Sequence, residues 1–290
     1  MTVIDPAIES HYGTGYERSR LFPGGQPSLE FVRSMELLDR LLPPPAQVLD
    51  AGGGPGAYAA PLAGRGYQVH LVDPGKDVRV KDWVAWHTAY DDPSSSLSAR
   101  LRRVRSHLSE AIDRAPPGPV RLVSLCAGQG HDVIGTLPSH PRRDDVRAVL
   151  VEADPRNAGL ARRAAAEAGL AQVEVREADA GTVTSFAGAL PADVLLLCGI
   201  FGNISDRDIK RTVEAAPALC RVGATVIWTR HRRPPDLTPQ VRAWFAESGF
   251  DEIAFDALGT SALTAVGVNR IRRAPAPGLP SRPLFAFRSA

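Results

Sequence analysis

Two glycine-rich turns follow apolar runs in this sequence, and turns of this kind can bind a small cofactor. The first lies in VLDAGGGPGAY, residues 48–58, and the second in LVSLCAGQGHDV, residues 122–133. Because glycine has no side chain, it lets a strand turn sharply into a helix and lets the backbone approach a nucleotide-like ligand. One such turn is weak support for binding, since many doubly wound folds use one for close packing.

Carboxylates at the ends of the following apolar runs strengthen this interpretation for the second turn. Glu152 ends the run RAVLVE, and Asp179 follows the run QVEVREA. Open α/β sheets bind their ligands over the carboxyl ends of the strands. The glycine turn, Glu152 and Asp179 stand in this order, each at the end of a predicted strand, and together they predict one binding crevice.

Other kinds of site chemistry have little support in the sequence. No serine stands in a G-x-S-x-G motif, and no histidine pair has the H-E-x-x-H spacing of a zinc site. The three cysteines form no Cys-x-x-Cys pair: Cys126, Cys198 and Cys220. This odd and scattered set argues against a disulfide framework and indicates a reducing compartment. We therefore expect a cytoplasmic protein without a bound metal.

The bulk composition is that of a globular protein. The chain has 290 residues, 44% of them hydrophobic, and a net charge of +2. It lacks an uncharged apolar run of about 18 residues and a basic, then apolar N-terminal signal, so we expect neither export nor membrane insertion. The balanced charge argues against a nucleic-acid partner, and the basic clusters at 230–233 and 270–273 are short.

The order of the predicted elements divides the chain into two parts. Residues 1–75 contain a helix at 31–42 and then a compact βαβ segment that stops after its second strand. The charged, aperiodic residues 76–81 are expected to form a linker. Residues 82–290 are expected to form one complete domain.

The second part alternates strands and helices. A long amphipathic helix is expected at 94–115, where serines can cap its start and APPGP stops it. Apolar runs then alternate with helix-type segments as far as the fifth run, GATVIWTR, and further strands follow. This pattern predicts an α/β fold with a doubly wound, mostly parallel sheet covered on both faces and antiparallel strands at its C-terminal edge.

In its element order and in the residues at its strand ends, this second part resembles the class I S-adenosylmethionine-dependent methyltransferases. The resemblance implies a Rossmann-like fold and S-adenosyl-L-methionine as the cofactor. It implies that Gly128 and Gly130 approach the methionine part of the cofactor. It also implies that Glu152 binds the ribose hydroxyls, with Asp154 as the alternative acid.

The resemblance assigns further roles at the following strand ends. Asp179 would accept from the adenine amino group, while the backbone amide of Ala180 reaches the ring. Asp132 would either contact the cationic cofactor or cap a helix. Three residues after the fourth strand would face the sulfonium or the acceptor: Cys198, Gly199 and Phe201.

The glycine turn of the second part departs from the family pattern, acid-x-Gly-x-Gly-x-Gly. Ser124 and Cys126 replace the acid and the first glycine. The N-terminal turn matches the pattern fully, with a counterpart of the ribose acid as well: Asp50, Gly52, Gly54, Gly56 and Asp73. Because an adenine pocket also needs loops after a third and a fourth strand, we interpret residues 1–75 as the truncated front end of another methyltransferase. A working second cofactor site is the alternative.

Two segments beside the expected crevice have both a structural and a functional interpretation. The aromatic stretch WVAWHTAYDD, residues 83–92, is either a helix packed on the sheet or a lid whose rings attract a sulfonium. The basic run 230–233 is either a solvated loop or a clamp for an anionic acceptor, with His231 as general base. Asn203 either forms a local turn or orients the loop after the fourth strand or the acceptor.

The expected reaction is transfer of the sulfonium methyl group to an unidentified small-molecule acceptor. Alignment of the reactants can supply most of the catalysis, because the cofactor is intrinsically activated. The fourth strand is followed by CGIFGN and not by an Asn/Asp-Pro-Pro-aromatic segment, which argues against base amines and glutamine amides as acceptors. Two alternatives remain: a non-catalytic binding protein on a decayed methyltransferase fold, and an NAD(P)-dependent oxidoreductase.

Overall fold

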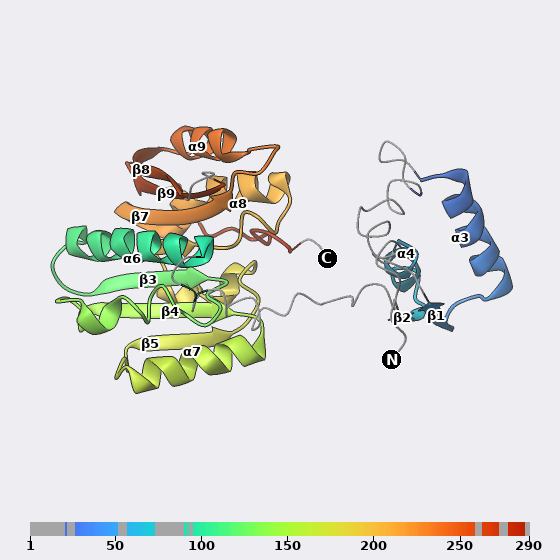
Figure 1. Ribbon diagram of the computed structural model, residues 1–290, viewed down its shortest axis with the longest axis horizontal. Coiled ribbons are helices and arrows are strands. Elements are labelled where there is room, and N and C mark those ends of the chain that lie inside the picture. Colours follow the sequence, from blue (N-terminus) through green and yellow to red (C-terminus); the bar gives the residue numbers. More distant parts are fainter. Residues whose placement is uncertain are drawn as a thin grey trace. The chain divides into compact units, whose positions relative to one another are not determined.

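The computed structural model describes residues 21, 27–51, 57–72, 90, 92, 95–258, 263–272 and 278–287 (Figure 1). The chain divides into two compact units, Met1–Asp82 and Trp83–Ser289. No helix within the described ranges is long and apolar enough to span a membrane. Several predicted features lie outside the described residues: the N-terminal glycines at 52–56, Asp73, the linker at 76–81 and the aromatic stretch apart from residues 90 and 92.

The N-terminal unit contains a two-stranded parallel sheet and two helices among its described residues. Its elements are α3 (Leu29–Leu41), β1 (Gln47–Ala51), α4 (Ala59–Ala63) and β2 (Gln68–Val72). The order β1-α4-β2 confirms the predicted βαβ segment. Met35, Leu62 and Tyr67 form its buried core. The relation of this unit to a methyltransferase stays a prediction.

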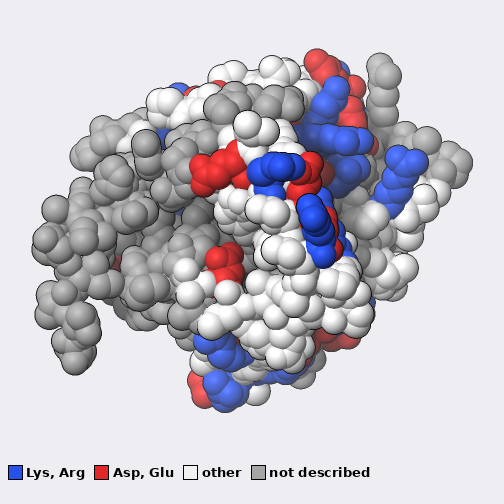
Figure 2. All heavy atoms as spheres, turned by 90° about the vertical axis from the view of Figure 1, so that its right-hand side faces the viewer, with Lys and Arg blue, Asp and Glu red and all other residues white. Residues whose placement is uncertain are grey.

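Charges of both signs are interspersed over the described surface that Figure 2 shows. In the N-terminal unit, Arg33 bonds to Glu36 at 2.8 Å within α3, and Arg65 forms an ion pair with Asp39. All four side chains are exposed, so these pairs contribute little to stability.

A seven-stranded sheet forms the centre of the second unit. Its strands are β3 (Val120–Leu125), β4 (Val146–Glu152), β5 (Val173–Glu177), β6 (Ala192–Leu197), β7 (Cys220–His231), β8 (Phe250–Leu258) and β9 (Thr264–Ile271). They lie in the order β5-β4-β3-β6-β7-β9-β8, and β9 runs antiparallel to both of its neighbours. The predicted doubly wound, mostly parallel sheet with an antiparallel C-terminal edge is confirmed. Because the chain order reverses between β3 and β6, a ligand crevice is expected over the carboxyl ends there.

Helices cover both faces of this sheet (Figure 1). They are α6 (Ser96–Arg114), α7 (Pro155–Glu167), α8 (Asp206–Leu219) and α9 (Thr238–Glu247). One apolar cluster joins α6 and α7 to the sheet and includes Leu108 and Ala161. The other joins α8 and α9 to the sheet and includes Val213 and Phe245. The central strands are continuous apolar runs because both of their faces are buried.

Two strand connections lack the α-helix that alternation predicts. After β3 the chain passes through turns to the 3-10 helix η3 (Leu137–Ser139). Between β5 and β6 it forms the 3-10 helices η4 (Val183–Ser185) and η5 (Ala187–Ala189). The expectation of a helix in every connection is wrong here, because both segments are rich in helix-breaking residues: Gly130, Gly135, Pro138, Gly181, Gly188 and Pro191.

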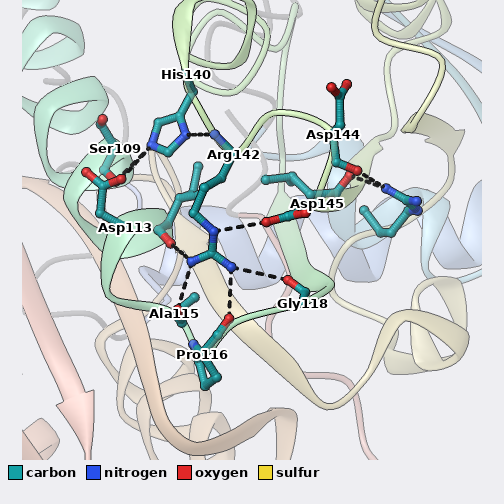
Figure 3. A network of polar contacts seen from close by, with 12 residues as sticks. Ser109, Asp113, Ala115, Pro116, Gly118, His140, Arg142, Asp144 and Asp145 are labelled. Atoms are coloured by element: carbon teal, nitrogen blue, oxygen red, sulfur yellow. Dashed lines mark hydrogen bonds and ion pairs between the residues drawn. The ribbon is translucent and has the colours of Figure 1, made fainter.

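The C-terminal end of α6 is held by the guanidinium of Arg142 (Figure 3). Its Nη1 donates to the carbonyl oxygens of Ile112 and Ala115 at 2.6 and 2.7 Å. Its Nη2 donates to those of Pro116 and Gly118 at 2.8 and 3.2 Å. Carbonyl groups in and just after the last turn of a helix lack the N–H donors that a further turn would supply, and Arg142 provides a charged donor to them. Arg142 therefore fixes α6 relative to the start of β3.

The substitution Arg142→Met is expected to lower the free energy of unfolding by about 2–3 kcal/mol, because four carbonyl oxygens lose a charged donor. The control is Arg114→Met, which removes an exposed pair with Glu110 and is expected to cost less than about 0.5 kcal/mol. Urea unfolding followed by circular dichroism measures both values. Equal effects of the two substitutions would contradict the role given to Arg142.

Candidate functional site

The turn after β3 lies where the strand order reverses. Cys126, Gly128 and Gly130 have positive φ angles of 53°, 57° and 72°. Gly130 also packs tightly, because a Cβ there would lie 2.6 Å from Ile134 Cδ1. The left-handed region costs a residue with a side chain about 1–2 kcal/mol, so Cys126 is strained where the family pattern has glycine. The turn has the sharp backbone that its glycines predict.

Glu152, at the end of β4, bonds directly to this turn. Its Oε2 accepts from the backbone N–H of Gly128 at 2.8 Å, and its Oε1 accepts from that of Asp154 at 2.8 Å. Each carboxylate oxygen has a further lone pair, so Glu152 can still receive ligand hydroxyls. The sequence pattern left the choice between Glu152 and Asp154 open, and the geometry places Glu152 at the turn.

Asp154 has a structural partner instead. Its carboxylate caps α7 by accepting from the backbone N–H of Arg156 at 2.8 Å. It also pairs with the Arg156 guanidinium at 3.0 Å, and this partner holds the pKa of the Asp154 carboxyl below its usual range. The Asp154 side chain therefore serves as the N-cap of α7.

Asp179 follows β5 and organises the next loop. Its Oδ1 accepts from the Gly181 N–H at 2.8 Å, and its Oδ2 accepts from the Thr182 hydroxyl at 3.2 Å. The residue is exposed, whereas Ala180 beside it is buried. Asp179 therefore presents a carboxylate to solvent from a loop whose backbone it shapes.

Backbone hydrogen bonds show that these strand ends converge: the Ala127 N–H in the turn donates to the Val151 carbonyl at 3.0 Å, and the Ala178 N–H after β5 donates to the Glu152 carbonyl at 3.1 Å. Burial raises the pKa of the Cys126 thiol well above the usual value, and the charges of Glu152 and Asp179 raise it further. The ends of β3, β4 and β5 thus bring the glycine turn and both carboxylates together. Ionised carboxylates only accept hydrogen bonds, so the arrangement suits a ligand with hydroxyl and amino groups.

A second group of residues surrounds the end of β6. Gly199 has a positive φ of 77° and donates its N–H to the Thr229 hydroxyl at 2.8 Å. Asn203 Nδ2 donates to the Gly199 carbonyl at 2.7 Å and so orients this loop, in line with one of its two interpretations. Burial raises the pKa of the half-buried Cys198 thiol, and the carboxylate of Asp132 raises it further.

The expectation that Phe201 faces the sulfonium or the acceptor is wrong. Its side chain is fully buried and packs against Trp228, with ring centroids 5.9 Å apart. Burying a large apolar ring in the core is more favourable than exposing it in a polar crevice.

Asp132 is buried and does not cap a helix, because turns follow it. Its Oδ1 accepts from the Val133 N–H at 2.8 Å. Burial raises the pKa of its carboxyl, while the Val133 N–H and the charges of Arg105 and Arg100 lower it. Two arginines of α6 thus compensate the charge of Asp132.

These arginines also hold the residues around the glycine turn. Arg100 Nη2 donates to the Tyr90 hydroxyl at 2.8 Å, and the Tyr90 ring packs on that of His131, with centroids 5.0 Å apart. Arg105 donates from Nε and Nη2 to the His131 carbonyl at 2.8 and 2.5 Å. Tyr90 belongs to the aromatic stretch and lies beside the turn. The sequence did not single out Arg100 and Arg105, because they look like the solvated arginines of any amphipathic helix.

The side chains of the basic run 230–233, at the end of β7, lie in different environments. Arg230 is 9% exposed, and its Nη1 donates to the backbone carbonyl of Phe201 in the loop after β6. Arg232 pairs with Asp236 at 3.0 Å. The His231 ring lies beside the same loop, since a Cβ on Gly202 would be 3.2 Å from its Cδ2. The run does not form one clamp: Arg230 and His231 lie against the loop after β6, whereas Arg232 pairs with Asp236.

Metal ligands do not gather in the part of the chain that the structure describes, where no three His, Cys, Asp or Glu side chains come together. Cys126, Cys198 and Cys220 are free thiols. The candidate site, as far as it is described, consists of backbone groups, carboxylates, two arginines and His231.

Comparisons with known proteins bear on the fold. No protein-family model and no curated protein matches the sequence. An O-methyltransferase family protein from Burkholderia thailandensis superposes with a TM-score of 0.52 at 16% identity, over 68% of this chain. The chain spans 62% of that protein's length. Magnesium protoporphyrin IX methyltransferase from Synechocystis PCC 6803, solved with bound S-adenosylmethionine, superposes with a TM-score of 0.51 at 10% identity, over 66% of this chain and 92% of that one.

Both structures are methyltransferases by description, and the likeness to them is one of fold. It agrees with the strand order and with the reversal between β3 and β6. The second unit of this chain has the fold of the class I S-adenosylmethionine-dependent methyltransferases.

Proposed function

We propose that this chain is an S-adenosylmethionine-dependent methyltransferase that acts on a small-molecule acceptor. The observation that carries the proposal is the hydrogen bond from the Gly128 N–H to Glu152, with Asp179 just past the end of the neighbouring parallel strand β5. A glycine turn and two carboxylates therefore meet at the reversal of strand order. A hydride-transfer enzyme instead needs a pyrophosphate on the N-terminus of an α-helix, and no α-helix lies between this turn and β4.

The residues present fit the groups of this cofactor. Glu152 would accept from the ribose hydroxyls, and Asp179 and the amide of Ala180 would hold the adenine. Gly128 and Gly130 would let the backbone approach the methionine part. When bound, the cofactor supplies an electrophilic methyl group on a sulfonium. The cationic end would be placed near three residues at the turn and at the end of β6: Asp132, Cys198 and Gly199.

The remaining task of the chain is to align the acceptor and exclude water. Tyr90, held by Arg100, would close the site over the turn and offer its ring to the sulfonium. His231 would hold the acceptor beside the loop after β6 and take its proton. Alignment supplies most of the rate enhancement in such a transfer.

We also propose that the N-terminal unit is a remnant without a cofactor. Its described sheet has two strands, and an adenine pocket of this fold needs loops after a third and a fourth. The glycine turn with Asp50 and the acid at Asp73 would then have no binding role.

Calorimetric titration with S-adenosylhomocysteine tests the assigned pocket. Glu152→Gln is expected to raise the dissociation constant at least about tenfold, because one acceptor becomes a donor. Asp154→Asn is the matched control two residues away and is expected to change it less than about twofold. Asp73→Ala is expected to change nothing. Loss of binding in Asp73→Ala, with binding kept in Glu152→Gln, would place the working site in the N-terminal unit.

Methyl transfer from labelled S-adenosylmethionine to a panel of small hydroxyl, amino and thiol compounds tests the activity. With an acceptor found, His231→Asn is expected to lower kcat by about a hundredfold, as for loss of a general base. The same variant is expected to keep its affinity for S-adenosylhomocysteine, because His231 lies on the acceptor side. Tight cofactor binding without transfer to any member of the panel would favour the non-catalytic alternative.

A further inference from the structure

The C-terminal segment 283–287 lies between two loops of the candidate site. The Leu284 N–H donates to the Gly181 carbonyl at 2.7 Å, in the loop that begins with Asp179. Phe287 forms an antiparallel bridge with Ile204, in the loop after β6. The segment therefore connects the loop assigned to the adenine with the loop assigned to the acceptor.

Helix α8 anchors this segment. Arg211 Nε and the Thr212 hydroxyl donate to the Leu284 carbonyl at 3.0 and 3.1 Å. The Ala286 N–H donates to Asp208 Oδ2 at 3.3 Å. Each of these contacts comes from the first half of α8. The segment is thus tied to a rigid element as well as to the loops.

The segment also contributes buried apolar side chains next to the β5–β6 connection, which has no α-helix to cover the sheet. Leu284 and Phe285 are 0% and 2% exposed. They belong to the same apolar cluster as Val183 and Phe186 of that connection. Where an α-helix would cover the sheet, the short 3-10 helices and the C-terminal segment cover it together.

Gly181 lies between the segment and Asp179 and bonds to both. Its N–H bonds to Asp179 Oδ1 at 2.8 Å, and its carbonyl accepts from Leu284. It also touches the segment closely, because a Cβ at Gly181 would lie 2.3 Å from the Phe285 carbonyl oxygen. One residue thus contacts the adenine-side carboxylate and the C-terminal segment at once.

We propose that segment 283–287 is a positioning element of the adenine subsite. By fixing Gly181 it holds the Asp179 carboxylate in the orientation that receives the adenine amino group. This inference rests on the proposed function, and it predicts that weakening the anchor on α8 lowers nucleobase selectivity without any change in a residue that touches the cofactor.

The test compares Arg211→Met with Arg207→Met, an exposed arginine one turn earlier on α8. Calorimetry measures the dissociation constants of S-adenosylhomocysteine and of S-inosylhomocysteine, which has a carbonyl in place of the amino group. The unsubstituted chain is expected to prefer the adenine form. Arg211→Met is expected to weaken S-adenosylhomocysteine binding about fivefold, to weaken the inosine form less, and so to reduce the preference. Arg207→Met is expected to change neither constant more than about twofold.

A second pair of variants keeps the test informative if Arg211→Met folds poorly. Gly181→Ala pushes against the segment, whereas Gly188→Ala in the same connection meets nothing within 4 Å. Gly181→Ala is expected to lose the preference for adenine and Gly188→Ala to keep it. An unchanged preference in Arg211→Met and Gly181→Ala, with normal binding by the unsubstituted chain, would refute the positioning role alone. No binding of S-adenosylhomocysteine by the unsubstituted chain would overturn the proposed function and this inference together.

Discussion

The hydrogen bond from the Gly128 N–H to Glu152 is the constraint on which the candidate site depends. It ties the turn after β3 to the end of β4, on the side of the sheet where the chain order reverses. With its other oxygen Glu152 holds the Asp154 N–H, and Asp154 starts α7. One carboxylate therefore sets the turn, the strand end and the beginning of the next helix, and it keeps lone pairs for a ligand.

The two sides of the site are built by different means. On the turn side, arginines of α6 hold Tyr90 and the His131 carbonyl, and Arg142 fixes α6 at its other end. On the side of Asp179, the loop bonds to a segment more than a hundred residues away in the sequence, through the Leu284 N–H and the Gly181 carbonyl. The connection between β5 and β6 has no α-helix, and this explains the difference. The apolar side chains that such a helix would cover pack instead against Leu284 and Phe285.

Much of the fold could be predicted from the sequence, since a central strand buried on both faces is a continuous apolar run. Glu152 and Asp179 were placed at the ends of their strands by this pattern together with the resemblance to the methyltransferases, and the structure has them there. Contacts that join distant segments have no local signal, so Arg100 and the C-terminal segment were missed. Phe201 was misplaced because an aromatic residue just after a strand fits a core and a crevice equally well by pattern. The 3-10 helices depend on single glycines and prolines within otherwise helix-like segments.

A crystal structure of the full chain with S-adenosylhomocysteine tests directly whether the second unit holds the cofactor. We expect electron density over the carboxyl ends of β3 to β6, with the ribose hydroxyls on Glu152 and the adenine amino group on Asp179. Density at the N-terminal glycine turn beside Asp50, with none at Glu152, would contradict this expectation.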